Sequence, residues 1–123
     1  MILVDTSVWV DHLRAGNDRL TALLTRGEVL GHPFVTGELA LGDLRRRDAV
    51  LSDLRDLPQA VVASDEEVLY YIDHQMLFGR GIGYVDAHLL AATRLTAPAK
   101  LWTRDQRLQA VAVALSLAAT LSH

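Results

Sequence analysis

Four acidic residues that lie far apart in the sequence are the candidates for chemistry: Asp5, Glu38, Asp86 and Asp105. Asp5 ends an apolar run of strand-like length, and Glu38 is the only charge in a largely apolar segment. Asp86 and Asp105 each lie at the start of an apolar helical pattern. By this periodicity, each of the four falls on the side of its element that we expect to face protein.

Carboxylates gathered in one place must be neutralised. Two of them about 5 Å apart repel by roughly 3 kcal/mol at an effective dielectric constant near 20. Four together would therefore offset much of the roughly 5–15 kcal/mol that stabilises a domain. Either some of them are protonated or a divalent cation binds them, and oxygen ligands without cysteine favour Mg²⁺ or Mn²⁺. Such a centre is typical of nucleases, in which the metal activates a water for in-line attack at phosphorus.

Each acid considered alone is weaker evidence for a metal site, because most of them could have a structural role. Asp5 can cap the helix expected after it, and Asp86 and Asp105 also lie at helix starts, where a carboxylate is favoured. Glu38 has no such structural role. An unpaired carboxylate inside an apolar helix costs several kcal/mol, so Glu38 favours a shared site for the set.

The elements that must position these acids alternate between short apolar runs and helical patterns. Strands are expected in the run that ends at Asp5 and at residues 29–30, 59–63, 101–103 and 117–121. Helices are expected from Thr6 or Ser7 to Gly16, from Asn17 to Gly27, over 34–41, from about Arg45 to Leu57, from Ser64 to Gly79, from Tyr84 to before Pro98, and from Asp105 to Leu115. This alternation predicts one α/β domain over residues 1–123, a three-layer sandwich with a mostly parallel sheet of about five strands. Ligands bind at the carboxyl ends of such strands, where Asp5 is expected.

The helix after Ser64 has the clearest local signals. Ser64 followed by Glu67 predicts a capping box, and Gly79 follows the last turn. The side chains expected to face the core are Val68, Leu69, Ile72 and Met76.

Composition limits the function classes only loosely. The formal net charge is −3, but setting the four acids aside changes it to +1, and eleven of the twelve basic residues are arginine, the side chain best matched to phosphate. Cysteine is absent, which excludes disulfides and suits a reducing compartment, so the cytoplasm is the expected location. No apolar segment is long enough to span a bilayer, and no membrane association is expected.

The four acids lie in motifs that resemble a known family. The motifs are the opening Ile2–Ser7, then Gly37–Leu39, Gly83–Ala92 and Trp102–Leu108, which follow one another over nearly the whole chain. In this order they resemble the PIN domain, and specifically the VapC-type toxins of bacterial type II toxin–antitoxin modules. The resemblance implies a metal-dependent endoribonuclease, inhibition by a VapB-type antitoxin, a homodimer, and a structured RNA such as tRNA as substrate.

The resemblance also implies roles for individual residues. Asp5 and Asp86 would be the principal metal ligands, Asp105 a direct or water-mediated ligand, and Glu38 would orient a metal-bound water. Thr6 and Thr103 would hydrogen-bond the carboxylates. Arg80 and Arg104 stand next to the acidic segments in sequence, which makes them the candidates for contact with RNA.

Three other classes of protein remain to be compared with the nuclease. A phosphorylatable receiver domain needs paired acids at the first strand, whereas Asp5 is followed by Thr6 and Ser7. A phosphotransferase with a nucleophilic aspartate usually has a second Asp two residues later, where Ser7 stands. The stronger alternative is a PIN-like binding module without catalysis, against which the complete set of four acids argues.

Overall fold

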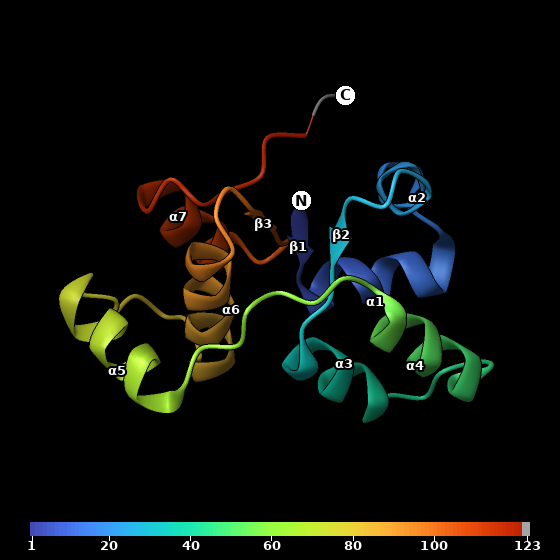
Figure 1. Ribbon diagram of the computed structural model, residues 1–123, viewed down its shortest axis with the longest axis horizontal. Coiled ribbons are helices and arrows are strands. Elements are labelled where there is room, and N and C mark those ends of the chain that lie inside the picture. Colours follow the sequence, from blue (N-terminus) through green and yellow to red (C-terminus); the bar gives the residue numbers. More distant parts are fainter. Residues whose placement is uncertain (122–123) are drawn as a thin grey trace.

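The computed structural model describes residues 1–121, which contain a small parallel sheet surrounded by helices (Figure 1). The strands are β1 (Ile2–Val4), β2 (Val29–Leu30) and β3 (Lys100–Trp102), in the order β2-β1-β3. Both pairings are parallel, with Leu3 opposite Leu30 on one side and opposite Leu101 on the other. The expected α/β class with a parallel sheet is confirmed, and β1 is its central strand.

The number of strands was predicted wrongly, because the described chain has three and not about five. Residues 59–63 and 117–121 each contribute a single bridge, Gln59 to Gly31 and Ala118 to Leu101. The first segment leaves the sheet because the N–H of Val61 donates to Thr96 Oγ1, at 2.9 Å, and not to a neighbouring strand. Both segments lie at the two edges of the sheet but are too briefly paired to form strands.

Helices occupy all seven expected places. They are α1 (Thr6–Ala15), α2 (Asp18–Thr25), α3 (Pro33–Ala40), α4 (Arg47–Asp56), α5 (Asp65–His74), α6 (Tyr84–Leu95) and α7 (Gln106–Ala114). Local signals set several of the starts: the Asn17 side chain accepts a hydrogen bond from the N–H of Leu20, and Ser64 and Glu67 form both bonds of the expected capping box. Among residues 1–121, none of these helices is long and apolar enough to cross a bilayer.

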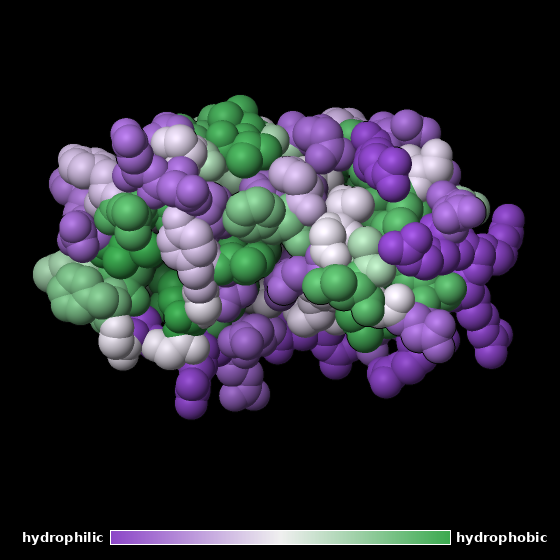
Figure 2. Space-filling view, turned by 90° about the horizontal axis from the view of Figure 1, so that it is seen from below, coloured by the Kyte–Doolittle hydropathy of each residue, from purple (hydrophilic) through white to green (hydrophobic). Residues whose placement is uncertain are grey.

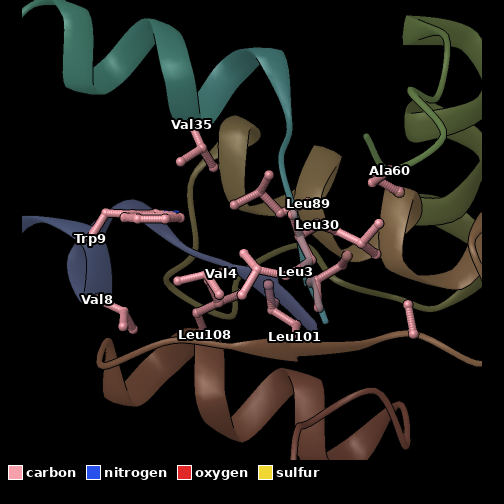
Figure 3. Packing of buried hydrophobic residues seen from close by; sticks show 14 of the residues in the cluster. Leu3, Val4, Val8, Trp9, Leu30, Val35, Ala60, Leu89, Leu101 and Leu108 are labelled. Carbon is pink, nitrogen blue, oxygen red and sulfur yellow. The ribbon is translucent and has the colours of Figure 1, made fainter. Parts of the chain in front are cut away.

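The core lies on both faces of β1. Figure 3 shows Leu3 and Val4 of β1 between Leu89 of α6 and Leu108 of α7, and all four side chains are completely buried. Truncating such a leucine to alanine typically costs 2–5 kcal/mol, so this packing holds β1 firmly between two helices. The residue that follows β1 is therefore presented at a well-defined place.

Two of the four core positions predicted for the helix after Ser64 are exposed. Val68 is completely buried and Ile72 is half-buried, but Leu69 and Met76 are 56% and 66% exposed. The helix ends at His74, and Met76 has a positive φ of 52°, so the helical periodicity used in the prediction does not reach it. Apolar groups of this kind interrupt the mostly polar surface on the face seen in Figure 2.

Candidate active site

Asp5 lies at the carboxyl end of β1, as expected, and its side chain is almost completely buried, with 6% exposed. It occupies the N-cap position of α1, yet its carboxylate accepts no capping hydrogen bond from that helix. Asp5 Oδ2 accepts hydrogen bonds from Thr103 Oγ1, at 2.7 Å, and from Ser7 Oγ, at 2.8 Å. The explanation of Asp5 as a simple helix cap therefore does not hold, since the carboxylate points away from the helix N–H groups.

Asp86 and Asp105 do take part in helix starts. Asp86 Oδ2 accepts from the backbone N–H of Gly83 at 3.0 Å, which ties the first turn of α6 to the residue before it. Asp105 is the N-cap of α7, and its Oδ1 accepts from the N–H groups of Arg107 and Leu108 at 2.9 and 3.0 Å. A structural role for these two residues is thus present beside any chemical one.

Glu38 and Asp105 are exposed, which corrects the expectation that all four acids face protein. On α3 the buried residues are Val35 and Leu39, so Glu38 stands beside the buried face and not within it. The cost of an unpaired buried carboxylate therefore does not apply to Glu38. Its Oε1 instead accepts a hydrogen bond of 2.6 Å from the hydroxyl of Thr6, the residue after Asp5.

Electrostatics connects the four acids. The pKa of the Asp86 carboxyl is raised above its ordinary value, first because the side chain is partly buried and also because the charges of Asp5, Asp105 and Glu38 act on it; the hydrogen bond from Gly83 opposes the rise. Residues separated by up to 100 positions in the sequence thus share one electrostatic environment. The fold therefore places three charges that are distant in the sequence within electrostatic range of Asp86.

The hydrogen bonds leave half of each carboxylate unengaged. Within residues 1–121, no hydrogen bond reaches the second oxygen of any of the four groups, namely Asp5 Oδ1, Glu38 Oε2, Asp86 Oδ1 and Asp105 Oδ2. Over the same residues, no three acidic or histidine side chains lie close enough, in their present rotamers, to hold a metal ion. The oxygen donors fit a hard cation in kind, but within residues 1–121 no three of them are gathered around one point.

Thr103 is at the centre of the hydrogen-bond network. Its buried hydroxyl donates to Asp5 Oδ2 and accepts from the backbone N–H of Asp105 at 3.0 Å. The hydroxyl of Thr6 donates to Glu38. Each of the two threonines singled out in the sequence therefore donates a hydrogen bond to a different one of the four carboxylates. Arg80 is exposed in the turn before α6 and, among the described residues, forms no hydrogen bond or ion pair.

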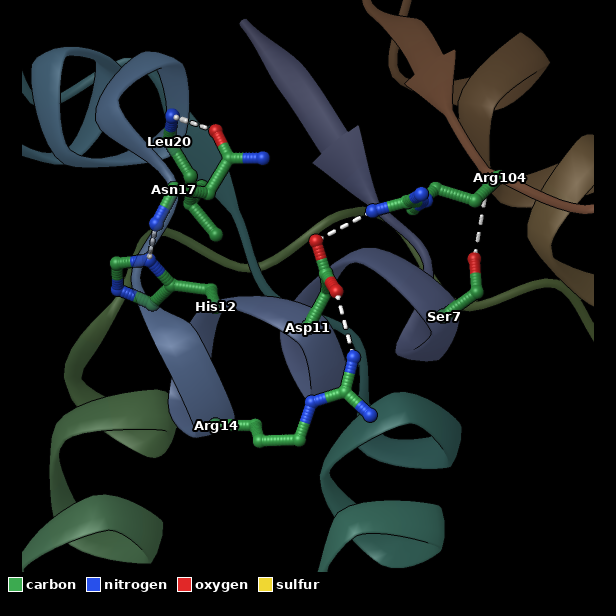
Figure 4. Close-up of polar contacts among 7 residues, drawn as sticks. All are labelled: Ser7, Asp11, His12, Arg14, Asn17, Leu20 and Arg104. Atoms are coloured by element: carbon green, nitrogen blue, oxygen red, sulfur yellow. Dashed lines mark hydrogen bonds and ion pairs between the residues drawn. The ribbon is translucent and has the colours of Figure 1, made fainter.

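Three residues near the site were missed by reading the sequence: Ser7, Asp11 and Arg14. Ser7 Oγ donates to Asp5 and accepts from the backbone N–H of Arg104 at 3.0 Å, and Asp11 forms ion pairs with Arg14 and Arg104 (Figure 4). The spacing of Asp5 and Ser7 was a usable signal, because a hydroxyl two residues after an aspartate commonly bonds to it locally. The pairing of Asp11 with Arg104 had no local signal.

Comparison with known proteins identifies the family of this chain. The model of the family described as "PIN domain" matches residues 2–114. Ribonuclease VapC32 of Mycobacterium tuberculosis, in strains CDC 1551 / Oshkosh and ATCC 25618 / H37Rv, is 52% identical to this chain over 110 residues, which cover 89% of each of the two chains. The chain therefore belongs to the PIN domain family.

Proposed function

We propose that this chain is an endoribonuclease that depends on a divalent cation and acts as the toxin of a type II toxin–antitoxin module. The observation that carries the proposal is the buried carboxylate of Asp5 at the end of β1, which accepts hydrogen bonds from Thr103 and Ser7, and the charges of Asp5, Glu38 and Asp105 also act on Asp86. The M. tuberculosis relatives are named as ribonucleases, which supports the same activity. Asp5 adds support because it is buried without serving as a helix cap.

The cation would be Mg²⁺ or Mn²⁺, the ions suited to an all-oxygen set of ligands. Asp5 and Asp86 would hold it, with Asp105 as a direct or water-mediated ligand, through the oxygens that hydrogen bonds leave unengaged. When bound, the cation lowers the pKa of water and offsets the charge that develops on the phosphoryl oxygens. Glu38, held by Thr6, would orient the attacking water.

The remaining residues of the site keep the carboxylates in place. Thr103 and Ser7 hydrogen-bond Oδ2 of Asp5. Within residues 1–121 no hydrogen bond reaches the other oxygen, Oδ1, which would bind the cation. Water and not the ribose 2′-hydroxyl is the nucleophile in this reaction, so hydrolysis should leave 5′-phosphate and 3′-hydroxyl ends. No side chain needs to form a covalent bond to the RNA.

The proposed setting is that of the family. The substrate would be a structured RNA such as tRNA, and a VapB-type antitoxin would inhibit the cleavage. A homodimer in the cytoplasm is the proposed state of the toxin.

The test is cleavage of RNA by the purified chain in Mg²⁺, with and without EDTA, followed by identification of the ends. Asp5→Asn should abolish cleavage and leave the circular dichroism spectrum unchanged. Glu28→Gln is the matched control, because Glu28 precedes β2 and so lies at the opposite, amino end of the strands. Cyclic phosphate ends, or cleavage that persists in EDTA, would refute the mechanism. RNA or antitoxin binding without any cleavage would instead indicate a non-catalytic binding module.

A further inference from the structure

Asp11 on α1 holds two arginine side chains at once. Its Oδ1 lies 3.2 Å from Nη2 of Arg14, one turn further along the helix, and its Oδ2 pairs with Nη1 of Arg104, which is 93 residues away in the sequence (Figure 4). In Figure 4 the Asp11 carboxylate lies between the two guanidinium groups. The trio has one negative and two positive charges, so it presents a net positive charge to solvent.

Arg104 is fixed at both its main chain and its guanidinium. Its backbone N–H donates to Ser7 Oγ at 3.0 Å, and the same hydroxyl donates to Asp5 Oδ2 at 2.8 Å. The guanidinium is held by Asp11, although 56% of the side chain is exposed. The hydroxyl of Ser7 therefore connects the backbone of Arg104 to the buried carboxylate of Asp5, while Asp11 fixes the orientation of the partly exposed Arg104 side chain.

Arg14 approaches the candidate site from the other side of the trio. It lines a hollow of about 480 Å³ together with Glu38, and residues 42–45, which include the charged Asp43 and Arg45, form much of the remaining wall. Arg14 is more exposed than Arg104, and its guanidinium contacts the opposite oxygen of Asp11. Arg104 is thus linked to Asp5 through the hydroxyl of Ser7, and Arg14 lines the same hollow as Glu38.

The energy of these ion pairs does not explain why they exist. Exposed pairs of this kind contribute about 0–1 kcal/mol to folding, since water screens them and ordering long side chains costs entropy. Each guanidinium carries five N–H donors in a planar fork that matches the oxygens of a phosphate. Asp11 occupies only one side of each fork, which leaves donors on both arginines for a ligand.

We propose that Arg14 and Arg104 bind backbone phosphates of the RNA next to the bond that is cut, and that Asp11 is a positioning residue that orients both guanidiniums. The proposal rests on the proposed function and names how the same site receives its substrate. Four carboxylates repel an RNA strand, so cations fixed at the rim would hold the flanking phosphates while the scissile bond enters the acidic centre. The contacts would be independent of base sequence.

The test measures how RNA binding depends on salt. A fluorescein-labelled single-stranded oligoribonucleotide is titrated with the full chain in Ca²⁺ at several salt concentrations, its anisotropy is recorded, and a gel checks that it remains intact. Each phosphate contact contributes about −0.7 to the slope of log K against log [salt] for a single strand. We expect Arg104→Gln and Arg14→Gln each to reduce the slope by about 0.7 and to weaken binding by about fivefold at moderate salt.

Arg26→Gln is the matched control. Arg26 is as exposed as Arg104, with 59% of its side chain accessible, and it also pairs with an acid, Glu28, at 3.4 Å. That pair lies before β2, at the amino end of the strands, so its loss should leave the slope unchanged. An equal loss of slope in Arg26→Gln and Arg104→Gln would overturn the proposal, because it would show a diffuse effect of net charge.

A double-mutant comparison isolates the role of Asp11. Asp11→Ala should weaken binding in the parent by releasing both arginines, but should leave it unchanged or tighten it when Arg14→Gln and Arg104→Gln are already present. Tighter binding by Asp11→Ala in the parent would overturn the positioning role and show that Asp11 competes with RNA. Cleavage in Mg²⁺ is measured separately. If the parent cleaves RNA but the arginine variants have the same salt slope as the parent, this inference alone is refuted. Altered slopes without cleavage refute the nuclease proposal alone.

Discussion

Thr103 donates a hydrogen bond of 2.7 Å to Asp5 Oδ2 and so joins two residues that are 98 positions apart in the chain. The parallel pairing of β1 with β3 makes this contact, because Val4 lies opposite Trp102 and the next residues meet beyond the sheet. The same hydroxyl accepts from the N–H of Asp105. One buried side chain therefore orders two of the four acids.

The first prediction concerns that hydroxyl. Thr103→Val keeps the shape of the side chain but removes the donor to Asp5 and the acceptor for Asp105. We expect the free energy of unfolding to fall by about 1–3 kcal/mol, since buried polar groups lose their partner, and RNA cleavage to fall at least tenfold. Denaturant unfolding and the cleavage rate in Mg²⁺ provide the measurements.

Thr103→Ser is the matched control, because it retains the hydroxyl and loses only a methyl group. It should recover most of the cleavage rate. If the serine and valine variants were equally impaired in cleavage, packing of the methyl group and not the hydrogen bond would be the reason.

The second prediction concerns repulsion among the acids. Asp86 is partly buried and experiences the charges of the other three, so Asp86→Asn should raise the melting temperature in EDTA. In Mg²⁺ the difference should shrink or reverse, because the parent would then gain stability from the bound ion. Thermal melts of the two proteins under both conditions decide this. A lower melting temperature of Asp86→Asn in EDTA would mean that the hydrogen bond to Gly83 outweighs the repulsion.

The third prediction is a loss of stability in acid that is due to His32. This residue is completely buried at the start of α3, and its Nδ1 accepts from the N–H of Phe34 at 3.0 Å. Burial and, secondly, the nearby charge of His88 lower the pKa of His32 to about 4. The unfolded chain therefore binds more protons than the folded one between pH 6.5 and 4, and stability should fall as the pH drops through this range, by up to about 3 kcal/mol.

The contribution of His32 is isolated by comparing how the unfolding free energy depends on pH in the parent and in a variant. His32→Asn keeps an acceptor at the N-cap but cannot be protonated, and it should flatten the dependence of the unfolding free energy on pH between 6.5 and 4. The absolute stability of this variant will differ because asparagine is smaller, so only the slopes are compared. An unchanged slope would place the acid sensitivity in other groups.

The fourth prediction concerns the turn that leads to Asp86. Gly81 has a φ of 79°, and a Cβ there would lie 2.8 Å from Cδ of Arg107 on α7. Gly81→Ala should therefore destabilise the fold by about 1–2 kcal/mol and reduce cleavage, because the turn between α5 and α6 has to shift. Urea unfolding and the cleavage rate measure the two effects.

Shortening the neighbour separates crowding from backbone strain. In the double variant Gly81→Ala/Arg107→Ala the close contact is gone while the positive φ remains. We expect partial recovery of stability relative to Gly81→Ala. The absence of any recovery would assign the whole cost to the backbone conformation.

Much of the local structure followed from the sequence. Asn17 and the pair Ser64 and Glu67 marked helix starts correctly, since each forms hydrogen bonds with residues only three positions away. The apolar run before Asp5 indicated a strand, and the structure places that strand in the centre of the sheet. The family motifs around the four acids led to the PIN domain, to which the chain belongs.

Distant contacts decided the rest. Glu38 was expected to face protein because its helix is apolar, but which side of α3 is covered depends on how α1 and α4 pack against it, and Glu38 is exposed. The two edge segments looked like strands, yet Val61 bonds to Thr96 and leaves the sheet. Such outcomes depend on contacts between separate elements of the chain, which no local pattern specifies.

The sequence by itself determined where helices start, that the run before Asp5 forms a strand, and which acids are available. Only the tertiary structure decided that Asp5 turns from α1 toward Thr103 and that Asp11 pairs with Arg104. The physical reason is range: caps and periodicity act within a few residues, whereas these contacts require the strands to be in register and packed. The candidate site is therefore a property of the folded sheet, assembled at the ends of β1 and β3.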